Sequence, residues 1–250
     1  MKILSLWGTF LFSGILSIIP AYGFMQGDCR ADGKTNTMPI RWEQAHHPLI
    51  SKPDRAKLLK GEILCEIKKV DPDTVVAESI GLIRAKAEDC FEVVRNYNQY
   101  VKLMPHTVEN KVIRTFQLEG DYNGVEAVDF WTRVRVFGFD TAYLLRIAHL
   151  SDLKKQLFRS FWTLVDNPAK LPACRDSEKR PCRNDLALNI GAHQFEPFSG
   201  NTDYTLHTYT LMISGKNWWQ QLAFKIGGKQ SMGDVTASIR NAVEKRQETR

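Results

Sequence analysis

Residues 216–246 constrain the fold of this chain more than any other stretch. Their apolar residues recur mostly at steps of three and four, and most of the positions between them are polar or charged. Such spacing is typical of an amphipathic α-helix with one apolar stripe. The stripe consists of Trp218, Leu222, Ile226, Met232, Val235, Ile239, Ala242 and Val243. The pattern predicts one long helix, or two helices with a break at Gly227-Gly228.

Most of the chain between residues 60 and 214 has the pattern of β-strands. Residues 61–70 and 74–85 predict a hairpin around the turn Asp71-Pro72-Asp73. Further strands are predicted at residues 108–118, 125–137, 140–150, 156–165, 191–198 and 203–214. Residues 87–105 interrupt the strands with helical spacing and predict two short helices. A long helix after so many antiparallel strands has to bury its stripe on the concave face of their sheet. We therefore expect an α+β fold with a cavity between the sheet and the C-terminal helix.

Residues 1–23 are predicted to direct export. One lysine precedes a long apolar run, which Pro20 and small residues up to Gly23 follow. This pattern is typical of a secretory signal peptide that is cleaved after Gly23. The alternative is an uncleaved membrane anchor, because about 20 apolar residues can span a bilayer. Pro20 and the small residues favour cleavage, so we expect a periplasmic or secreted protein.

The mature chain is expected to be a soluble monomer with one domain. Residues 24–57 are irregular and polar, and predict an N-terminal arm that lies over a domain of residues 58–250. The formal net charge of +6 is scattered along the chain, and no basic run resembles a nucleic-acid tract. We therefore expect no nucleic-acid partner. The basic excess is typical of a solvated face, with transient contact to anionic lipid headgroups as the alternative.

The five cysteines, an odd number, include two that are close together in the sequence. Cys174 and Cys182 bracket a polar loop, CRDSEKRPC, and no histidine lies within ten residues of either. In an oxidising compartment this predicts a disulfide rather than a zinc site, worth about 2–3 kcal/mol. Cys65 is expected in a strand core and Cys90 on a helix, and the pairing of Cys29 stays open.

Residues 125–137 show how one wall of the cavity could be made. In a strand, alternate side chains point to opposite faces. The set expected to face the cavity is Val128, Phe130, Thr132, Val134 and Val136, continued on the next strand by Tyr143, Leu145 and Ile147. The set expected to face solvent is Asp129, Trp131, Arg133 and Arg135. Residues 157–165 are apolar at both parities, so the pattern does not orient that strand.

Arg114 is a candidate polar anchor inside this pocket. It shares strand parity with the apolar residues Val112, Phe116 and Leu118. An edge or solvent position is the default for an arginine. Both hypotheses are kept.

Several segments together resemble a known superfamily. Ile83-x-Ala85, Cys90-Phe91-x-Val93-Val94 and Asn98-x-x-x-Val101-x-x-Met104-Pro105 resemble the first helical segment of the START-like superfamily, also called polyketide cyclase or SRPBCC. Gly191-x-x-x-Phe195-x-Pro197-x-x-Gly200-x-Thr202 is similar to the segment that joins its last two strands. The likeness covers residues 60–246 and is to the coenzyme Q-binding and polyketide-cyclase branch. The resemblance implies a helix-grip fold with an internal hydrophobic pocket.

The resemblance also implies further candidates for ligand contact, on elements that border the cavity of the related fold. They are Tyr97, Tyr100, Met104, Trp162, Phe195, Trp218 and Phe224. Apolar pockets and solid cores use the same residue types, so both alternatives stay open. Trp218-Trp219 stands where a proline often opens the last helix of the family, and the signal peptide, the arm and the cysteine loop are further departures from its pattern.

The favoured hypothesis is a carrier for a hydrophobic small molecule, such as a lipid, sterol, quinone or polyketide-like compound, without a cofactor. His193 and His207 could approach one another on neighbouring strands. However, no nucleophile-elbow, zinc-protease or phosphate-loop motif is present, and we assign no catalytic residue. A cyclase or hydrolase-type enzyme that uses the same cavity is the first alternative. An interaction protein with a filled pocket is the second.

Overall fold

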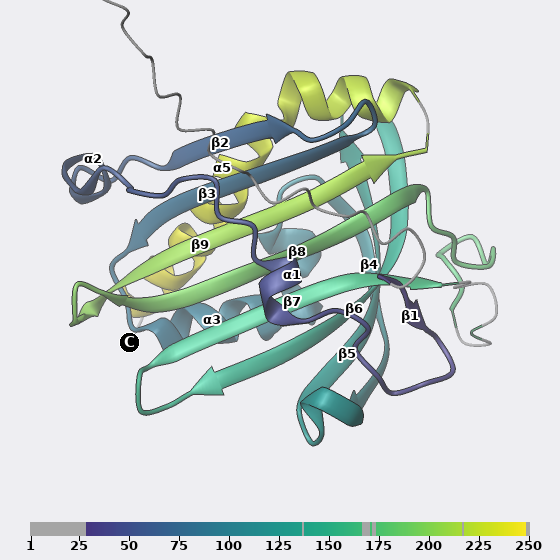
Figure 1. The fold of residues 1–250 in the computed structure, drawn as a ribbon, viewed down its shortest axis with the longest axis horizontal. Coiled ribbons are helices and arrows are strands. Elements are labelled where there is room, and N and C mark those ends of the chain that lie inside the picture. Colours follow the sequence, from purple (N-terminus) through teal and green to yellow (C-terminus); the bar gives the residue numbers. More distant parts are fainter. Residues whose placement is uncertain (1–28, 137, 167–170, 172–173, 217, 249–250) are drawn as a thin grey trace, which may run out of the picture.

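The computed structural model describes residues 29–248 apart from 137, 167–170, 172–173 and 217, with side chains omitted for 218–229 and 248 (Figure 1). The predicted signal peptide and the first residues of the arm lie outside this range. Within it, no helix is both long enough and apolar enough to cross a membrane.

In the described part of the chain, nine strands form one open sheet. Eight of them are antiparallel in the order β2-β3-β9-β8-β7-β6-β5-β4, and the short β1 pairs parallel with the end of β7. Their bounds are β1 Ala31–Asp32, β2 Leu64–Lys69, β3 Thr74–Ile83, β4 Thr107–Gln117, β5 Glu126–Val136, β6 Phe139–Asp152, β7 Leu157–Asp166, β8 Leu186–Phe198 and β9 Asn201–Gly215. The predicted strands are confirmed, although β8 begins five residues before its expected start.

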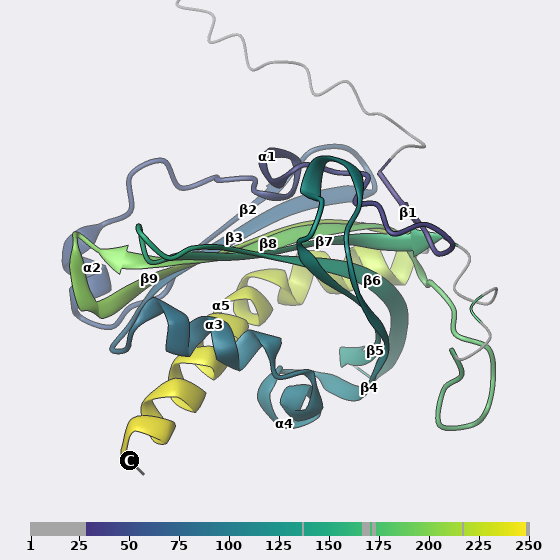
Figure 2. The same ribbon diagram turned by 90° about the horizontal axis from the view of Figure 1, so that it is seen from below.

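One long helix, α5 (Trp218–Glu248), runs along the concave face of the sheet. It is continuous through Gly227-Gly228, so the one-helix alternative is confirmed. The helical segment after β3 divides into α3 (Ala87–Arg95), the 3-10 turn η1 (Tyr97–Gln99) and α4 (Tyr100–Leu103), as predicted. Figure 2 shows these helices on one side of the sheet and α1 (Trp42–Ala45) on the other. The α+β helix-grip arrangement is therefore confirmed.

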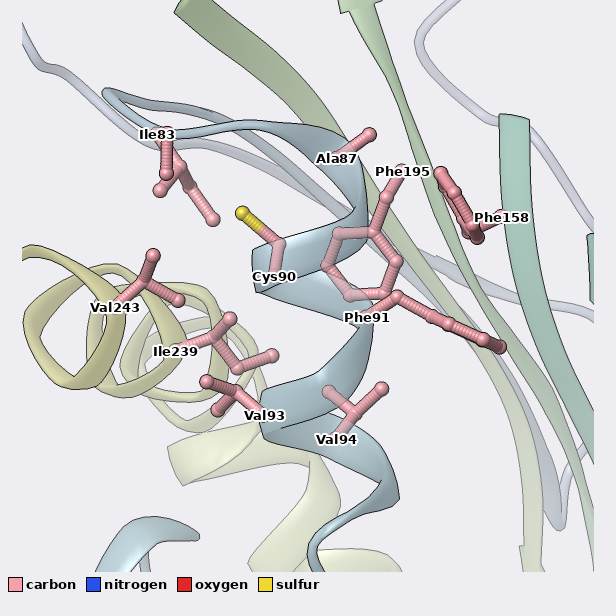
Figure 3. Packing of buried hydrophobic residues seen from close by; sticks show 11 residues of the cluster. Ile83, Ala87, Cys90, Phe91, Val93, Val94, Phe158, Phe195, Ile239 and Val243 are labelled. Carbon is pink, nitrogen blue, oxygen red and sulfur yellow. The ribbon is translucent and has the colours of Figure 1, made fainter. Parts of the chain in front are cut away.

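The helix α3 is held between α5 and the sheet by a buried apolar cluster (Figure 3). Phe91 projects toward the strands, where its ring centroid lies 5.3 Å from that of Phe158 and 6.5 Å from that of Phe195. Ile239 and Val243 contribute the α5 side of the cluster. This packing fills the space between α3, α5 and the sheet.

The convex face of the sheet is also buried, because the N-terminal arm lies across it. Met38, Ile40, Trp42 and Ala45 of the arm pack on a cluster that includes Phe161. The rings of Trp42 and Phe161 meet edge to face at 6.1 Å. Strand β7 is therefore apolar at both parities because both of its faces are covered.

This cover corrects one prediction about β5. Asp129 and Trp131 were expected to face solvent, but they are 0% and 2% exposed. Trp131 lies under the segment of the Cys174–Cys182 disulfide, and Asp129 lies beneath the arm in contact with two arginines. Only Arg135 of the predicted solvent set is mainly exposed, and it pairs with Asp140.

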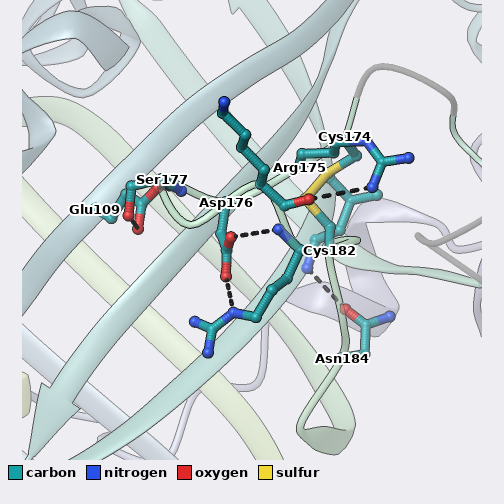
Figure 4. Close-up of a disulfide and its surroundings, with 10 residues drawn as sticks. Glu109, Cys174, Arg175, Asp176, Ser177, Cys182 and Asn184 are labelled. Atoms are coloured by element: carbon teal, nitrogen blue, oxygen red, sulfur yellow. Dashed lines mark hydrogen bonds and ion pairs between the residues drawn. A yellow bond between two sulfur atoms is a disulfide. The ribbon is translucent and has the colours of Figure 1, made fainter.

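The predicted disulfide between Cys174 and Cys182 is confirmed. Both cysteines are 2% exposed and belong to a buried cluster, whereas most residues between them are exposed. Figure 4 shows the disulfide and the residues around it. The carboxylate of Glu109 on β4 accepts hydrogen bonds from the backbone N–H and the hydroxyl of Ser177, at 2.6 and 3.0 Å. The loop is thus held on the sheet by the two buried cysteines and by Ser177. Two further short elements are the helix α2 (Arg55–Leu59), which precedes β2, and the 3-10 turn η2 (Gly120–Tyr122), which lies between β4 and β5 in the chain.

Candidate functional site

A cavity of about 230 Å³ lies between the concave face of the sheet, the η1–α4 segment and α5. Its lining is mostly aliphatic and aromatic, with polar side chains at a few positions. On β5 and β6 it is lined by Phe130, Thr132, Val134, Val136, Thr141, Tyr143, Leu145 and Ile147. The alternation seen in the sequence therefore oriented both strands correctly. The interior is therefore hollow, in contrast to the filled pocket of the second alternative.

Aromatic residues from the η1–α4 segment form the wall that faces β5. The ring centroids of Tyr97 and Tyr100 lie 4.8 and 5.0 Å from that of Phe130. The hydroxyl of Tyr100, in α4, donates a hydrogen bond to the carbonyl of Val94 in α3 at 2.7 Å, which fixes the ring against the end of α3. Met104 completes this wall.

Trp162 of β7 lines the cavity, with its ring close to the backbone of β8. Its indole Nε1 donates to the side-chain oxygen of Asn189 at 2.9 Å, which satisfies its buried polar group. The ring covers Gly191 on β8 so closely that a Cβ there would collide with it. The absence of a side chain at Gly191 is what lets the indole lie against the sheet.

Most of the predicted ligand contacts line this cavity. They are Tyr97, Tyr100, Met104, Phe130, Val134, Tyr143 and Trp162. Val128 belongs to a buried cluster with Phe130 and Trp162, and Phe195 packs against α3, but neither Val128 nor Phe195 is among the lining residues. Trp218 and Phe224 lie outside the described side chains. Whether any of these residues contacts a ligand stays a prediction.

Arg114 lies on the opposite face of the sheet, which corrects the hypothesis of a polar anchor in the pocket. A β-bulge between Val112 and Arg114 shifts the register of β4 on β5. As a result, Val112 is opposite Phe130 on the cavity side, whereas Arg114 is opposite Asp129 on the convex side. Its Nε donates to the Asp129 carboxylate at 2.6 Å. Parity along the sequence fails here because a bulge inserts one extra residue.

Polar residues that the sequence analysis did not assign to the pocket also line it. The hydroxyl of Tyr97 and His149 Nε2 are 2.7 Å apart, and His149 Nδ1 is 2.9 Å from the Ser160 hydroxyl. His193 also lines the cavity, and its Nδ1 lies 3.0 Å from Nε2 of His207, so the expected approach of these two histidines is confirmed. His149 shares parity with the apolar residues of β6 that face the cavity, and this signal could have revealed it.

Burial keeps these ionisable groups neutral. Desolvation lowers the pKa of His149 and that of His193 to about 3. It also raises the pKa of Tyr143 to about 12 and moves the pKa of Tyr209 upward. Among the residues described, no group of three or more His, Cys, Asp or Glu side chains is arranged to hold a metal ion. The cavity therefore offers uncharged hydrogen-bonding groups within an apolar lining.

Comparison with solved structures identifies the fold. A fragment of the STAR-related lipid transfer protein from Xanthomonas axonopodis matches with a TM-score of 0.55 and 13% identity, over 73% of this chain and 93% of that one. The human StarD13 lipid transfer and protein localization domain matches with a TM-score of 0.51 and 15% identity, over 72% and 84%. Human STARD10 matches with a TM-score of 0.51 and 10% identity, over 79% and 84%.

The protein therefore has the START-like fold that the sequence predicted. No family model and no curated protein matches the sequence itself. At identities of 10–15% the structural likeness defines the fold alone, so the coenzyme Q-binding and polyketide-cyclase branch stays a prediction.

Proposed function

We propose that this protein is an exported carrier that binds a hydrophobic small molecule, such as a lipid, sterol, quinone or polyketide-like compound. The observation that carries the proposal is the apolar cavity between the sheet and α5. Burial of apolar surface contributes about 25 cal/mol per Å², so an apolar ligand that buries about 300 Å² gains on the order of 7 kcal/mol before the costs of binding. Two of the compared structures are named as lipid transfer proteins, which supports the same class of cargo here.

A variant that fills the cavity tests this proposal. Val134 lines the cavity from β5, while its neighbour Arg135 points to the other face. Native mass spectrometry of protein purified from its own host should reveal bound apolar molecules. Val134→Trp should reduce that occupancy and the uptake of Nile red, whereas Arg135→Trp, with the same added side chain, should keep both. Wild-type protein that is reproducibly empty and takes up no apolar dye would contradict the carrier function.

Export is the second part of the proposal. The apolar N-terminal segment with its small residues before position 24 supports it, and so does the Cys174–Cys182 disulfide, since such bonds persist in oxidising compartments. The mature protein should begin at Phe24 when its N-terminal peptide is sequenced by mass spectrometry. A mature protein that retains residues 1–23 would show an anchor instead.

Delivery of the cargo requires the cavity to open, because α5 and the η1–α4 segment cover it. We propose that α5 or an adjoining loop moves during a transient contact with a membrane whose anionic headgroups attract the basic protein. Transfer of Nile red from the protein to vesicles should then be faster with anionic than with neutral lipid, and equal rates would remove the electrostatic part of this proposal.

One observation favours a cyclase or hydrolase-type enzyme as the alternative. The hydrogen-bonded chain of Tyr97, His149 and Ser160 lies against the cavity and could move a proton to or from a bound molecule. His149→Phe would then abolish turnover of the native cargo while the cargo still binds. A cargo that leaves the wild-type protein chemically unchanged would count against this alternative.

A further inference from the structure

A row of polar side chains crosses the apolar floor of the cavity. His149, Ser160, His193 and Tyr209 are register partners on the adjacent strands β6, β7, β8 and β9. All of them line the cavity. The next row on the same face is apolar and consists of the register partners Ile147, Trp162, Gly191 and Leu211. These four residues, called the polar row below, are therefore neighbours across the concave face of the sheet and are not scattered over it.

Around His149 and Ser160, one donor hydrogen is not used in the hydrogen bonds within the protein. Tyr97, His149 and Ser160 are linked by two hydrogen bonds. Neutral histidine carries one N–H and each hydroxyl carries one O–H, so the three groups hold three donor hydrogens. Whichever direction the chain takes, two hydrogens are used and one remains. In one direction the remaining hydrogen is on Ser160, and in the other it is on Tyr97.

The second half of the row holds another such donor. His193 Nδ1 and His207 Nε2 share one hydrogen bond, so one of the two N–H groups is left over. Placing it on His207 would bury an N–H without an acceptor, because His207 Nδ1 is buried and has no hydrogen-bond partner. An orphaned N–H costs more than an orphaned lone pair. His207 therefore donates to His193 Nδ1, and His193 carries its own hydrogen on Nε2.

Packing holds the ring of His193 in this position. The ring of Tyr209 on β9 stacks on it, with centroids 4.7 Å apart and planes inclined by 15°. The ring centroid of Trp162 on β7 lies 5.3 Å from that of His193. The titratable groups around it are His149, His207 and Tyr209, with Arg240 of α5 beyond His207. The histidines and the tyrosine are uncharged, so the row presents neutral donors to the cavity.

We propose that the cargo carries an uncharged oxygen acceptor, such as a carbonyl, which binds at this row between Ser160 and His193 Nε2–H. The inference rests on the carrier function and specifies the chemical class of its cargo. The apolar remainder of the cargo extends along β5 and β6 toward Tyr143 and Val134, where the lining is mostly apolar or aromatic and includes the two threonines Thr132 and Thr141. An ionised headgroup is disfavoured here, since neutral donors offset only part of the cost of burying a charge.

A pair of probes with equal chain length tests this assignment. Displacement of Nile red gives the dissociation constants of 2-undecanone and of undecane. The ratio of these two constants is compared between wild type and variant, so that the difference in hydration between the probes cancels. His193→Phe should shift the ratio toward undecane by about three- to tenfold, the value of one neutral hydrogen bond. Tyr143→Phe removes a hydroxyl from another part of the lining and should shift the ratio less than His193→Phe does.

The outcomes of this experiment separate the two proposals. A wild-type protein that binds undecane, with the same probe ratio in His193→Phe, overturns the role of the row and leaves the carrier function standing. A ratio that changes in Tyr143→Phe instead places the polar contact elsewhere and also overturns it. Wild-type protein that binds neither probe nor Nile red overturns the carrier function, and the inference with it.

A measurement on the unmodified protein covers the case in which His193→Phe does not fold. In the ¹⁵N NMR spectrum of the full chain, His193 should be neutral and protonated on Nε2, and saturation with 2-undecanone should shift that nitrogen more than saturation with undecane. A hydrogen on Nδ1, or equal shifts with both probes, would contradict the assignment.

Discussion

Asp129 lies between two arginines on the convex face of the sheet. The carboxylate accepts hydrogen bonds from Arg146 at 2.8 and 3.1 Å and from Arg114 at 2.6 Å. Asp129 and Arg146 are both fully buried. The arginines also reach the N-terminal arm, where Arg146 donates to the Thr37 carbonyl at 2.7 Å. At the residue scale, the Asp129 carboxylate holds Arg114 and Arg146 in place, and these two arginines bind the arm to the sheet.

Asp129→Asn should therefore destabilise the protein strongly. The substitution leaves a buried arginine without its counter-ion, which costs about 3–5 kcal/mol when one partner of a buried pair is removed. Urea unfolding measures the loss. The matched control is Asp121→Asn, whose partner Arg41 is 72% exposed, and its midpoint should change far less. Equal shifts in the two variants would show that Asp129 is not a buried charged partner.

The contact between α5 and β3 depends on residues without bulk. Ser79 and Thr236 share a hydrogen bond of 2.8 Å, and a Cβ at Gly81 would come within 2.5 Å of the Thr236 methyl group. On the helix itself, a Cβ at Gly233 would meet Cys65 Sγ at 3.4 Å, which is an ordinary contact. At the element scale, Gly81 sets how closely the helix approaches the sheet, whereas Gly233 does not.

Alanine at these two positions should have opposite effects. Gly81→Ala forces α5 outward and should cost about 1–3 kcal/mol, as overpacking does. Gly233→Ala fits its site and should add up to about 1 kcal/mol through helix propensity. Urea midpoints of the two variants, measured side by side, check the signs. Stabilisation by Gly81→Ala would mean that α5 lies farther from β3 than the structure has it.

The disulfide loop contributes stability of its own. In the chain-entropy account, closing a loop with a sequence separation of 8 is worth about 2–3 kcal/mol, and Cys174→Ser with Cys182→Ser should lose that amount. The free energy of unfolding, compared between this double variant and oxidised wild type, measures it. Ser177→Ala removes only the loop's hydroxyl contact to Glu109 and should cost less. A double variant as stable as oxidised wild type would show that the bond constrains nothing that folding needs.

Individual strands differed in how much their sequences revealed, and the reasons are physical. Strand β5 alternates cleanly, so its cavity-facing residues could be assigned, although the cover over Asp129 and Trp131 could not be foreseen. Strand β7 is apolar at both parities because a second layer, the arm, covers its convex face. On β4 the bulge before Arg114 inverted the parity argument. Sequence alternation is informative only where one face is open and the register is unbroken.

Buried neutral histidines make the stability of the whole molecule depend on pH. The pKa of His149 and that of His193 are lowered to about 3, and the pKa of His207 is also lowered. In the unfolded chain each takes up a proton near pH 6.5, whereas the folded protein excludes it. The free energy of unfolding that depends on these neutral histidines is therefore fully present above pH 6.5. It is lost as pH falls toward 3, by about 1.4 kcal/mol per pH unit for each histidine.

The midpoint of urea unfolding should accordingly fall between pH 7 and pH 5. Glu78 acts in the opposite direction over part of this window, because burial raises its pKa, but it is a single group. His193→Phe removes one titrating histidine, so its stability should depend less steeply on pH than that of wild type. A wild-type midpoint that stays constant from pH 7 to pH 5 would mean that these imidazoles are not buried in neutral form.

The sequence by itself determined the order of the elements, the side of β5 and β6 that faces the helix, and the local disulfide. Each of these follows from periodicity, turn residues or the proximity of two cysteines along the chain. The long helix after the strands also required a concave sheet, since its apolar stripe has no other place to be buried. These features depend on neighbours in the sequence, which is why they could be predicted.

Only the tertiary structure decided what the strands bring together across the sheet. His149, Ser160, His193 and Tyr209 are separated in the chain and meet because the registers of four strands align them. The cover of the convex face by the arm and the displacement of Arg114 from the pocket depend likewise on long-range packing and on a bulge. Register and layer contacts couple residues that are distant along the chain, so no local pattern could fix them.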